Sequence, residues 1–261
     1  MKHSKKYRIA RTKLILSQIL LFILILTMWE LGTRLRILDD FLFSKPSSIA
    51  SLLWAYIKNH EIFKHIYISL LETVLGIVIG SAAGVFIAVI LWASRRLTKL
   101  LEPFLVILNA LPKTALAPIM IIWAGTGVTG IVVVAISILI VITILSTYNY
   151  FINVDSEKIQ MMKSFNASKY QVFIKLVFPA NLVNIISVVK INIGMAWVGV
   201  IVGEFLVSRS GIGNLIMYGG QIFRFDMVMM GVIVLSIFAY LMYEGVNIIE
   251  KILIKKRGKG I

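Results

Sequence analysis

Long apolar runs alternate with short polar segments along the whole chain. Six of the runs are each close to the ~20 residues that an α-helix needs to cross ~30 Å of hydrocarbon. These runs cover residues 14–32, 68–93, 101–124, 128–150, 182–206 and 227–250. The pattern therefore predicts an all-α integral membrane protein with six transmembrane helices.

The composition supports the membrane class. Hydrophobic residues make up 59% of the 261 positions and charged residues only 15%, whereas about a quarter of the residues in a soluble domain are charged. The apolar part of the first run, residues 14–31, is too long for the core of a signal peptide, and no A-x-A-like cleavage site follows it. We therefore expect a first transmembrane helix. The chain has no cysteine, which excludes disulfides and cysteine-ligated metals.

The basic residues indicate the topology. A net charge of +15 would suggest nucleic-acid binding in a soluble protein. Here most of the 27 Lys and Arg residues fall on one side of the six spans: at both termini, around Arg95 and Arg96, and in the segment 153–181. The positive-inside rule places these regions in the cytoplasm. We expect a multi-pass protein of the cell (inner) membrane and no nucleic-acid partner.

Two segments on the opposite, external side are long enough to have structure of their own. In the segment 33–67, Ser44 and Pro46 indicate the start of an amphipathic helix. Its apolar positions are Leu52, Leu53, Tyr56, Ile57, Ile62 and Phe63. The segment 207–226 contains four glycines and a short apolar patch. It is typical of a re-entrant or interfacial turn, with a plain loop as the alternative.

Glycines recur every four residues in the second span, at Gly76, Gly80 and Gly84. Small residues at this spacing form a flat stripe on which another helix can pack closely. The stripe favours packing within the chain, and dimerisation through it is the alternative.

Motifs for catalysis or cofactor binding do not fit their context. The sequence GTGVTG, residues 125–130, matches a dinucleotide fingerprint but joins two spans instead of a strand and a helix. It predicts a tight hairpin. No Walker A motif is present. His60 and His65 are five residues apart, a spacing that does not place two metal ligands side by side on a helix. We expect no catalytic residue and no metal site.

Polar residues inside the runs are costly in lipid and mark functional or structural positions. Pro112 precedes Lys113, and Pro118 follows in the same run, so we expect the two prolines to break this helix. Glu204 lies near the external end of the fifth run.

The other ionisable residues in the apolar runs do not indicate a proton-coupled carrier. Glu72 and Glu244 lie near span ends, where we expect them in interfacial water. Lys190 is close enough to the cytoplasm to snorkel. The sequence shows no clear buried acid near mid-membrane, which argues against a proton-coupled carrier.

The pattern of the cytoplasmic segment 153–181 predicts two short capped helices. Asp155 is an N-cap, Asn166 suits a left-handed bend, and Ser168 with Gln171 forms a capping box. The second helix runs toward Pro179. Its apolar face consists of Tyr170, Phe173 and Val177. A projecting unit with such a face predicts docking into a groove on another protein.

This segment resembles the coupling ("EAA") motif of permease subunits of ATP-binding-cassette (ABC) importers. Gln160, Met161 and Met162 take the E-A-A positions, Asn166 takes the glycine position, and Pro179 takes the final proline. The acid is missing here, and the glycine is replaced by asparagine.

Three further stretches are similar to the nitrate/sulfonate/taurine branch of these permeases. Ala167, Ser168 and Gln171 match its G-A-S-x-x-Q stretch. LPKTALAPIMIIWAG matches a second stretch, with Ala124 where Phe is usual. The third match places Trp197, Glu204, Gly211 and Gly213 at family positions.

The resemblance implies a type I (MetI-like) importer permease. Residues 1–32 would be the basic N-terminus and first span, 33–67 an external loop, and 68–261 the permease core. The implied partners are a cytoplasmic ABC ATPase, an extracellular or periplasmic substrate-binding protein, a second permease copy and membrane lipid. ATP and Mg would be bound by the ATPase, and this chain would hold no cofactor.

The implied cargo is a small solute resembling a sulfonate, nitrate, taurine or a vitamin precursor. A stand-alone secondary carrier or channel, or a non-transport membrane scaffold, are the alternatives.

Overall fold

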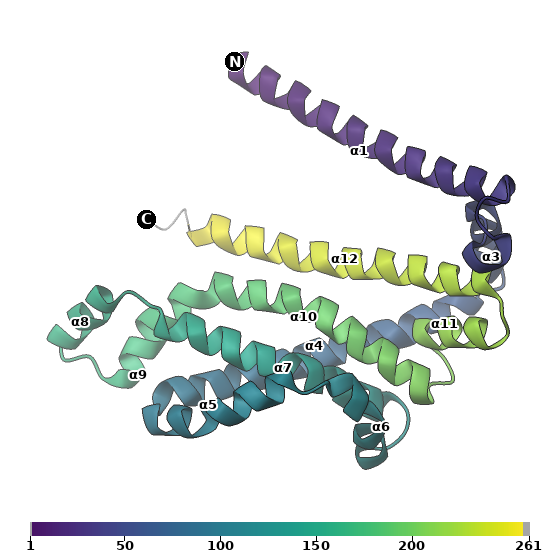
Figure 1. Ribbon diagram of the computed structural model, residues 1–261. Coiled ribbons are helices and arrows are strands. Elements are labelled where there is room, and N and C mark those ends of the chain that lie inside the picture. The colour runs from purple at the N-terminus through teal and green to yellow at the C-terminus, as the bar shows by residue number, and fades with distance from the viewer. Residues whose placement is uncertain (1, 258–261) are drawn as a thin grey trace. The chain divides into compact units, whose positions relative to one another are not determined.

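The computed structural model describes residues 2–257, with the side chains of residues 13–255. Every regular element in this part of the chain is a helix (Figure 1). The elements are α1 (Lys2–Arg34), α2 (Asp40–Phe43), α3 (Pro46–Lys58), α4 (Glu61–Ala93), α5 (Arg95–Ala110), α6 (Lys113–Ala124), α7 (Val128–Ile152), α8 (Ser156–Ser164), α9 (Lys169–Val172), the π-helix η1 (Phe173–Val177), α10 (Phe178–Val207), α11 (Ile212–Gln221) and α12 (Phe225–Arg257). Lys259, part of the basic C-terminus, lies outside the described residues.

Helices capable of crossing a membrane occur where the apolar runs predicted them. Five are single helices, within α1, α4, α7, α9–α10 and α12. The pair α5 and α6, bent by 100° at its break, is either a sixth, broken span or a re-entrant loop. The fold class predicted from the sequence is therefore confirmed. Within the described chain, residues 2–63 with 215–233 form one compact unit, and 64–214 with 234–257 form another.

The break in the third span occurs at one proline only. α5 ends at Ala110, and Pro112 stands at the N-cap of α6. The prediction that Pro118 also breaks the helix is wrong, because α6 continues through it. Pro118 lies in the second turn of α6, so its missing N–H frees only the carbonyl of Thr114.

The predicted hairpin after α6 is confirmed. Gly125 and Gly127 have φ angles of 92° and 97°, a backbone region that glycine enters without steric cost. These two residues turn the chain from α6 into α7.

α7 is the central helix of the larger unit, and two glycine-bearing helices pack on it. A Cβ on Gly80 of α4 would lie 2.5 Å from Leu139, and one on Gly84 would lie 2.7 Å from Thr143. Gly76 meets Ala135 in the same way. The glycine stripe is thus covered by α7 of the same chain.

α10 approaches α7 just as closely. A Cβ on Gly199 would lie 2.5 Å from the Cα of Ala135, and one on Gly203 would lie 3.1 Å from the Cα of Ile131. Ala135 and Ile131 are fully buried. A side chain at either position would collide with α7, so the two glycines let these helices approach closely.

A polar cluster joins the same three helices. The side-chain amide of Asn192 on α10 donates to Ser81 on α4 and to Thr143 on α7, both at 2.8 Å. Thr143 in turn donates to the carbonyl of Leu139. Hydrogen bonds between spans add to close packing where no water competes.

In the smaller unit, the predicted amphipathic helix begins at Pro46 as expected and forms α3. Two details differ. Ser44 is the C-cap of α2, and Ile62 and Phe63 belong to α4. The N-terminus of α3 is held instead by Glu30 of α1, which accepts bonds from the N–H and hydroxyl of Ser47 at 3.0 and 2.9 Å.

The close approach of α10 to α7 gives a first prediction. Gly199→Ala should destabilise the chain by about 1–3 kcal/mol, because the new methyl meets backbone that must shift. Thermal unfolding of the purified full-length chain in mild detergent measures the effect. The matched control is Gly194→Ala on the same helix, where a Cβ meets nothing within 4 Å. Equal unfolding temperatures for the two variants would contradict the packing described.

Candidate functional site

The segment 153–181, which we call the coupling segment after the motif that it resembles, has the local structure predicted from its polar residues. Asp155 accepts a bond from the N–H of Glu157 at 3.0 Å and caps α8. Asn166 has a φ of 56°, which is the left-handed bend. Ser168 and Gln171 form the capping box, with bonds of 2.8 and 3.3 Å. In Figure 1, α8 and α9 lie beyond the ends of α7 and α10.

The second helix of this segment does not end at Pro179. It begins at Lys169, widens into the π-helix η1, and continues as α10 to Val207. Pro179 lies in the first turn of α10, where proline is tolerated. The segment α9, η1 and α10 therefore runs without an intervening loop into a candidate membrane span.

The predicted shared face of Tyr170, Phe173 and Val177 is wrong. Phe173 and Val177 are buried in a cluster with Ala88, Val172 and Phe151. Tyr170 is 73% exposed. The ends of α4 and α7 offer an apolar site for Phe173, whose ring lies 4.9 Å from Trp92 and 5.4 Å from Phe151.

A different set of apolar side chains faces outward from this segment. Met161 is 56% exposed and Phe165 is 78% exposed, and both accompany Tyr170. We call these three residues the coupling surface. Of the remaining motif positions, Gln160 is exposed, whereas Met162 and Ala167 pack against the buried cluster.

At the opposite end of α10, Glu204 is buried and fully engaged by hydrogen bonds. Its Oε1 accepts from the hydroxyl of Ser69 and its Oε2 from the N–H of Gly213, both at 2.5 Å. Ser69 accepts from the N–H of Ile212 at 2.8 Å. A carboxylate at the first N–H groups of α11 also suits the helix dipole.

Gly211 and Gly213 are needed beside this carboxylate. A Cβ on Gly213 would lie 2.7 Å from Oε2 of Glu204, and Gly211 has a φ of 125° and touches the same group. Gly211 also donates to His65 of α4 at 3.0 Å. The structure thus brings together three of the residues that the sequence match singled out: Glu204, Gly211 and Gly213.

The location of the Glu72 side chain differs from the expectation. It was expected in interfacial water, yet it is 1% exposed, as is Glu204, and lies within interaction range of it. His65, Ser69 and Glu72 share one face of α4 at helical spacing. Both acids are thus buried in the protein, and the expectation that no acid lies near mid-membrane stays a prediction.

Lys190 does not snorkel. It forms an ion pair with Glu250 of α12 and donates to Asn247 at 3.2 Å. Ser187 of α10 also donates to Glu250 at 3.1 Å. Sequence analysis did not identify Glu250 as the partner of Lys190, because sixty residues separate the two.

The remaining predicted residues do not take part in the hydrogen bonds of Glu204. Trp197 is buried two turns earlier on α10, and its indole N–H has no acceptor among the described residues. Pro112 and Lys113 lie at the α5–α6 break, where Lys113 donates to the carbonyl of Asn109 at 3.3 Å.

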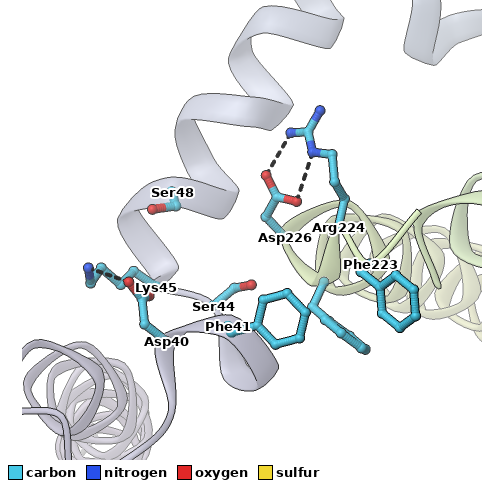
Figure 2. Close-up of a pocket in the computed structure, with 9 residues that line it drawn as sticks. Asp40, Phe41, Ser44, Lys45, Ser48, Phe223, Arg224 and Asp226 are labelled. Carbon is cyan, nitrogen blue, oxygen red and sulfur yellow. Dashed lines mark hydrogen bonds and ion pairs between the residues drawn. The ribbon is translucent and has the colours of Figure 1, made fainter. Parts of the chain in front are cut away.

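The smaller unit has a pocket that sequence reasoning missed (Figure 2). Arg224 forms a two-point ion pair with Asp226 at 2.7 and 3.3 Å. This bond raises the pKa of the Arg224 guanidinium. Lys45 pairs with Asp40 at 2.7 Å.

Aromatic rings complete this pocket. Phe41 lies 6.5 Å from Phe223 and 5.3 Å from Phe225, measured between ring centroids. Residues from 40–48 and 223–226 meet here, so no local pattern could have indicated the pocket.

Among the described residues, no group of three His, Asp or Glu side chains is placed to hold a metal ion.

The chain matches the family described as the binding-protein-dependent transport system inner membrane component over residues 76–259. The chain belongs to this family. It is a multi-pass inner-membrane permease subunit of an ABC importer, and the ATPase of such a system is a separate subunit. This assignment favours an importer over a stand-alone carrier or channel.

Relatives of the permease confirm the branch that its motifs indicated. It is 28% identical to the putative aliphatic sulfonates transport permease protein SsuC of Bacillus subtilis, over 92% of this chain and 87% of that protein. It is 21% identical to the taurine transport system permease protein TauC of Escherichia coli, over 87% and 84% of the two chains.

A solved structure shares the fold. An inward-facing form of the MetNI methionine ABC transporter aligns with a TM-score of 0.66 at 16% identity. The alignment covers 74% of this chain and 95% of the other. The MetI-like permease fold is thereby confirmed.

The Glu204 contacts give a second prediction. Glu204→Gln should destabilise the permease by about 1–3 kcal/mol, because one amide oxygen cannot accept from both Ser69 and Gly213. The turn containing the exposed Arg209 should then be cleaved faster by trypsin. Thermal unfolding and the cleavage rate at Arg209 in detergent measure the two effects.

Glu72→Gln is the matched control. Glu72 Oε2 has no hydrogen-bond partner in the described residues, and two ionised carboxylates side by side would repel each other. The control should therefore be neutral or stabilising. A Glu204→Gln variant that unfolds and is cleaved like this control would show that Glu204 does not hold the turn.

Proposed function

We propose that this permease lines the path of a small solute that resembles a sulfonate, nitrate, taurine or a vitamin precursor. An external substrate-binding protein would deliver the solute. The names of the related permeases support this class of cargo. The distribution of basic residues supports an orientation with both termini and the segment 153–181 in the cytoplasm.

The family implies an ATPase partner, and we place its contact on α8 and α9. The observation that carries this proposal is the coupling surface of Met161, Phe165 and Tyr170, which is exposed and apolar on a capped, stiff segment. An apolar knob of this kind fits a groove on a protein partner.

The anchoring of Phe173 supports a mechanical role for the segment. Phe173 packs against the ends of α4 and α7, and α9 continues into α10. Movement of the ATPases on binding ATP and Mg would therefore push on α10 without first bending a loose loop. We propose that this push switches the spans between inward-open and outward-open states.

On the other side of the membrane, the segments 33–67 and 207–226 would receive the binding protein. The pocket of Figure 2 supports this placement, because it offers both charged pairs and aromatic rings to a partner. We also propose that two copies of the permease form the transporter, surrounded by membrane lipid, and that this chain itself holds no cofactor.

The coupling surface gives a third prediction. Phe165→Asp or Tyr170→Asp should reduce ATPase binding by roughly 30-fold, which corresponds to about 2 kcal/mol at a central interface position. The measurement is the amount of ATPase that co-purifies with the tagged permease from native membranes, read by mass spectrometry. Uptake of solute by the same cells should fall in parallel.

Phe223→Asp is the matched control, since Phe223 is 66% exposed and belongs to the external segment. It should keep the ATPase. Phe173→Asp, in contrast, should lower the unfolding temperature because its side chain is buried. Full ATPase association in both coupling-surface variants would overturn the proposed contact.

A further inference from the structure

Two adjoining hollows lie where the coupling segment meets the ends of the membrane spans. Both are lined by Trp92, Ile159 and Lys169. One has a volume of about 350 Å³ and extends to Lys163 of α8. The other has a volume of about 440 Å³ and extends to Arg95 of α5. Together they form one site, which we call the elbow site because it lies at the turn from α4 into α5.

The elbow site is cationic. Arg95, Lys163 and Lys169 line it, and no acidic residue does. Arg95 and Lys163 form no ion pair within the described part of the chain. Lys169 donates to the carbonyl of Ala93 at 2.6 Å and lies 5.5 Å from the centre of the Trp92 ring. Its position is thus held by two contacts that leave its charge uncompensated.

The other side of the elbow site is apolar and aromatic. Leu91 and Trp92 end the span of α4, and Tyr148, Phe151 and Ile152 end the span of α7. Trp and Tyr are enriched at the level of lipid headgroups, where one part of the ring is apolar and the other is polar. A ligand here would meet hydrocarbon on one side and positive charge on the other.

We infer that the elbow site binds the phosphate-bearing headgroup of an anionic phospholipid. Basic pockets between spans on the cytoplasmic side attract such headgroups, since the inner leaflet carries anionic lipid. The apolar wall favours a lipid over an acidic side chain of the ATPase, because Leu91, Phe151 and Ile152 all belong to membrane-spanning helices. The assignment to the inner leaflet rests on the proposed orientation.

A bound headgroup would contact three elements at once. Arg95 is the first residue of α5, Lys163 lies in the last turn of α8, and Lys169 is the first residue of α9. The lipid would therefore brace the coupling helices against the end of α4. It would also neutralise three like charges that otherwise repel each other across the site.

The test measures lipid binding to the full-length permease. The chain is purified with its ATPase in mild detergent, stripped of lipid, and incubated with phosphatidylglycerol or phosphatidylcholine of identical acyl chains. Native mass spectrometry then reports the lipids that stay bound. Phosphatidylglycerol should be retained in preference. The double variant Arg95→Gln/Lys163→Gln should bind it about 30-fold more weakly, from two basic side chains near a membrane surface.

Arg96→Gln/Lys99→Gln is the matched control. It removes the same charge from two exposed neighbours that do not line the site, and it should bind phosphatidylglycerol like the unmodified chain. Equal retention by the two double variants, or no preference over phosphatidylcholine, would overturn the inference. Displacement of the lipid by an equal concentration of soluble glycerol phosphate would assign the site to a water-soluble phosphate and would also overturn it.

ATPase co-purification, read in the same spectra, separates this inference from the proposed function. Loss of the ATPase from Arg95→Gln/Lys163→Gln with unchanged lipid binding would make the elbow site an ATPase contact, which overturns the lipid assignment. A retained ATPase with no lipid preference would likewise overturn the lipid site but leave the proposed coupling contact intact.

Discussion

The close packing of α4 and α10 on α7 is the constraint on which the rest of the larger unit depends. Spans in a membrane gain little from apolar burial against each other, because lipid is as apolar as their side chains. They gain instead from van der Waals contact at short range, and Gly80, Gly84 and Gly199 permit such close contact with α7. The bonds of Asn192 to Ser81 and Thr143 hold the same three helices in register.

The two ends of α10 then acquire different properties. One end carries Glu204, whose carboxylate ties α4 to the first N–H groups of α11. The other end continues from α9, and there Phe173 packs against the ends of α4 and α7. A single long helix thus connects the coupling segment to a buried polar anchor near its far end. Rigid connection of this kind is what a permease needs if events at an ATPase are to move a distant part of the path.

Burial of the carboxyl pair has a cost that the surrounding contacts offset. Each buried carboxyl group loses its hydration, and one removed from water without partners is strongly unfavourable. Glu204 recovers this loss through Ser69 and Gly213, whereas Glu72 Oε2 remains without a hydrogen-bond partner in the described chain. These bonds therefore hold Glu204 from two sides, while Glu72 lies buried beside it.

Local features of the chain were predictable, and long-range contacts were not. The spans follow from the apolar runs, and the caps at Asp155 and Ser168 with the bend at Asn166 follow from side chains that bond backbone within a few residues. The family positions Glu204, Gly211 and Gly213 were recognisable as a motif. Their contact with each other, and with Ser69, was not.

What tertiary packing alone decided is which polar residues meet and which face of each helix is covered. Ser69 lies 135 residues from Glu204, and Asn192 lies 111 residues from Ser81. No periodicity links positions so far apart. Phe173 and Tyr170 look equivalent on a helical projection, yet the ends of α4 and α7 cover Phe173 and leave Tyr170 exposed. Burial at such positions depends on neighbours from other spans, and those neighbours are placed only when the helices pack.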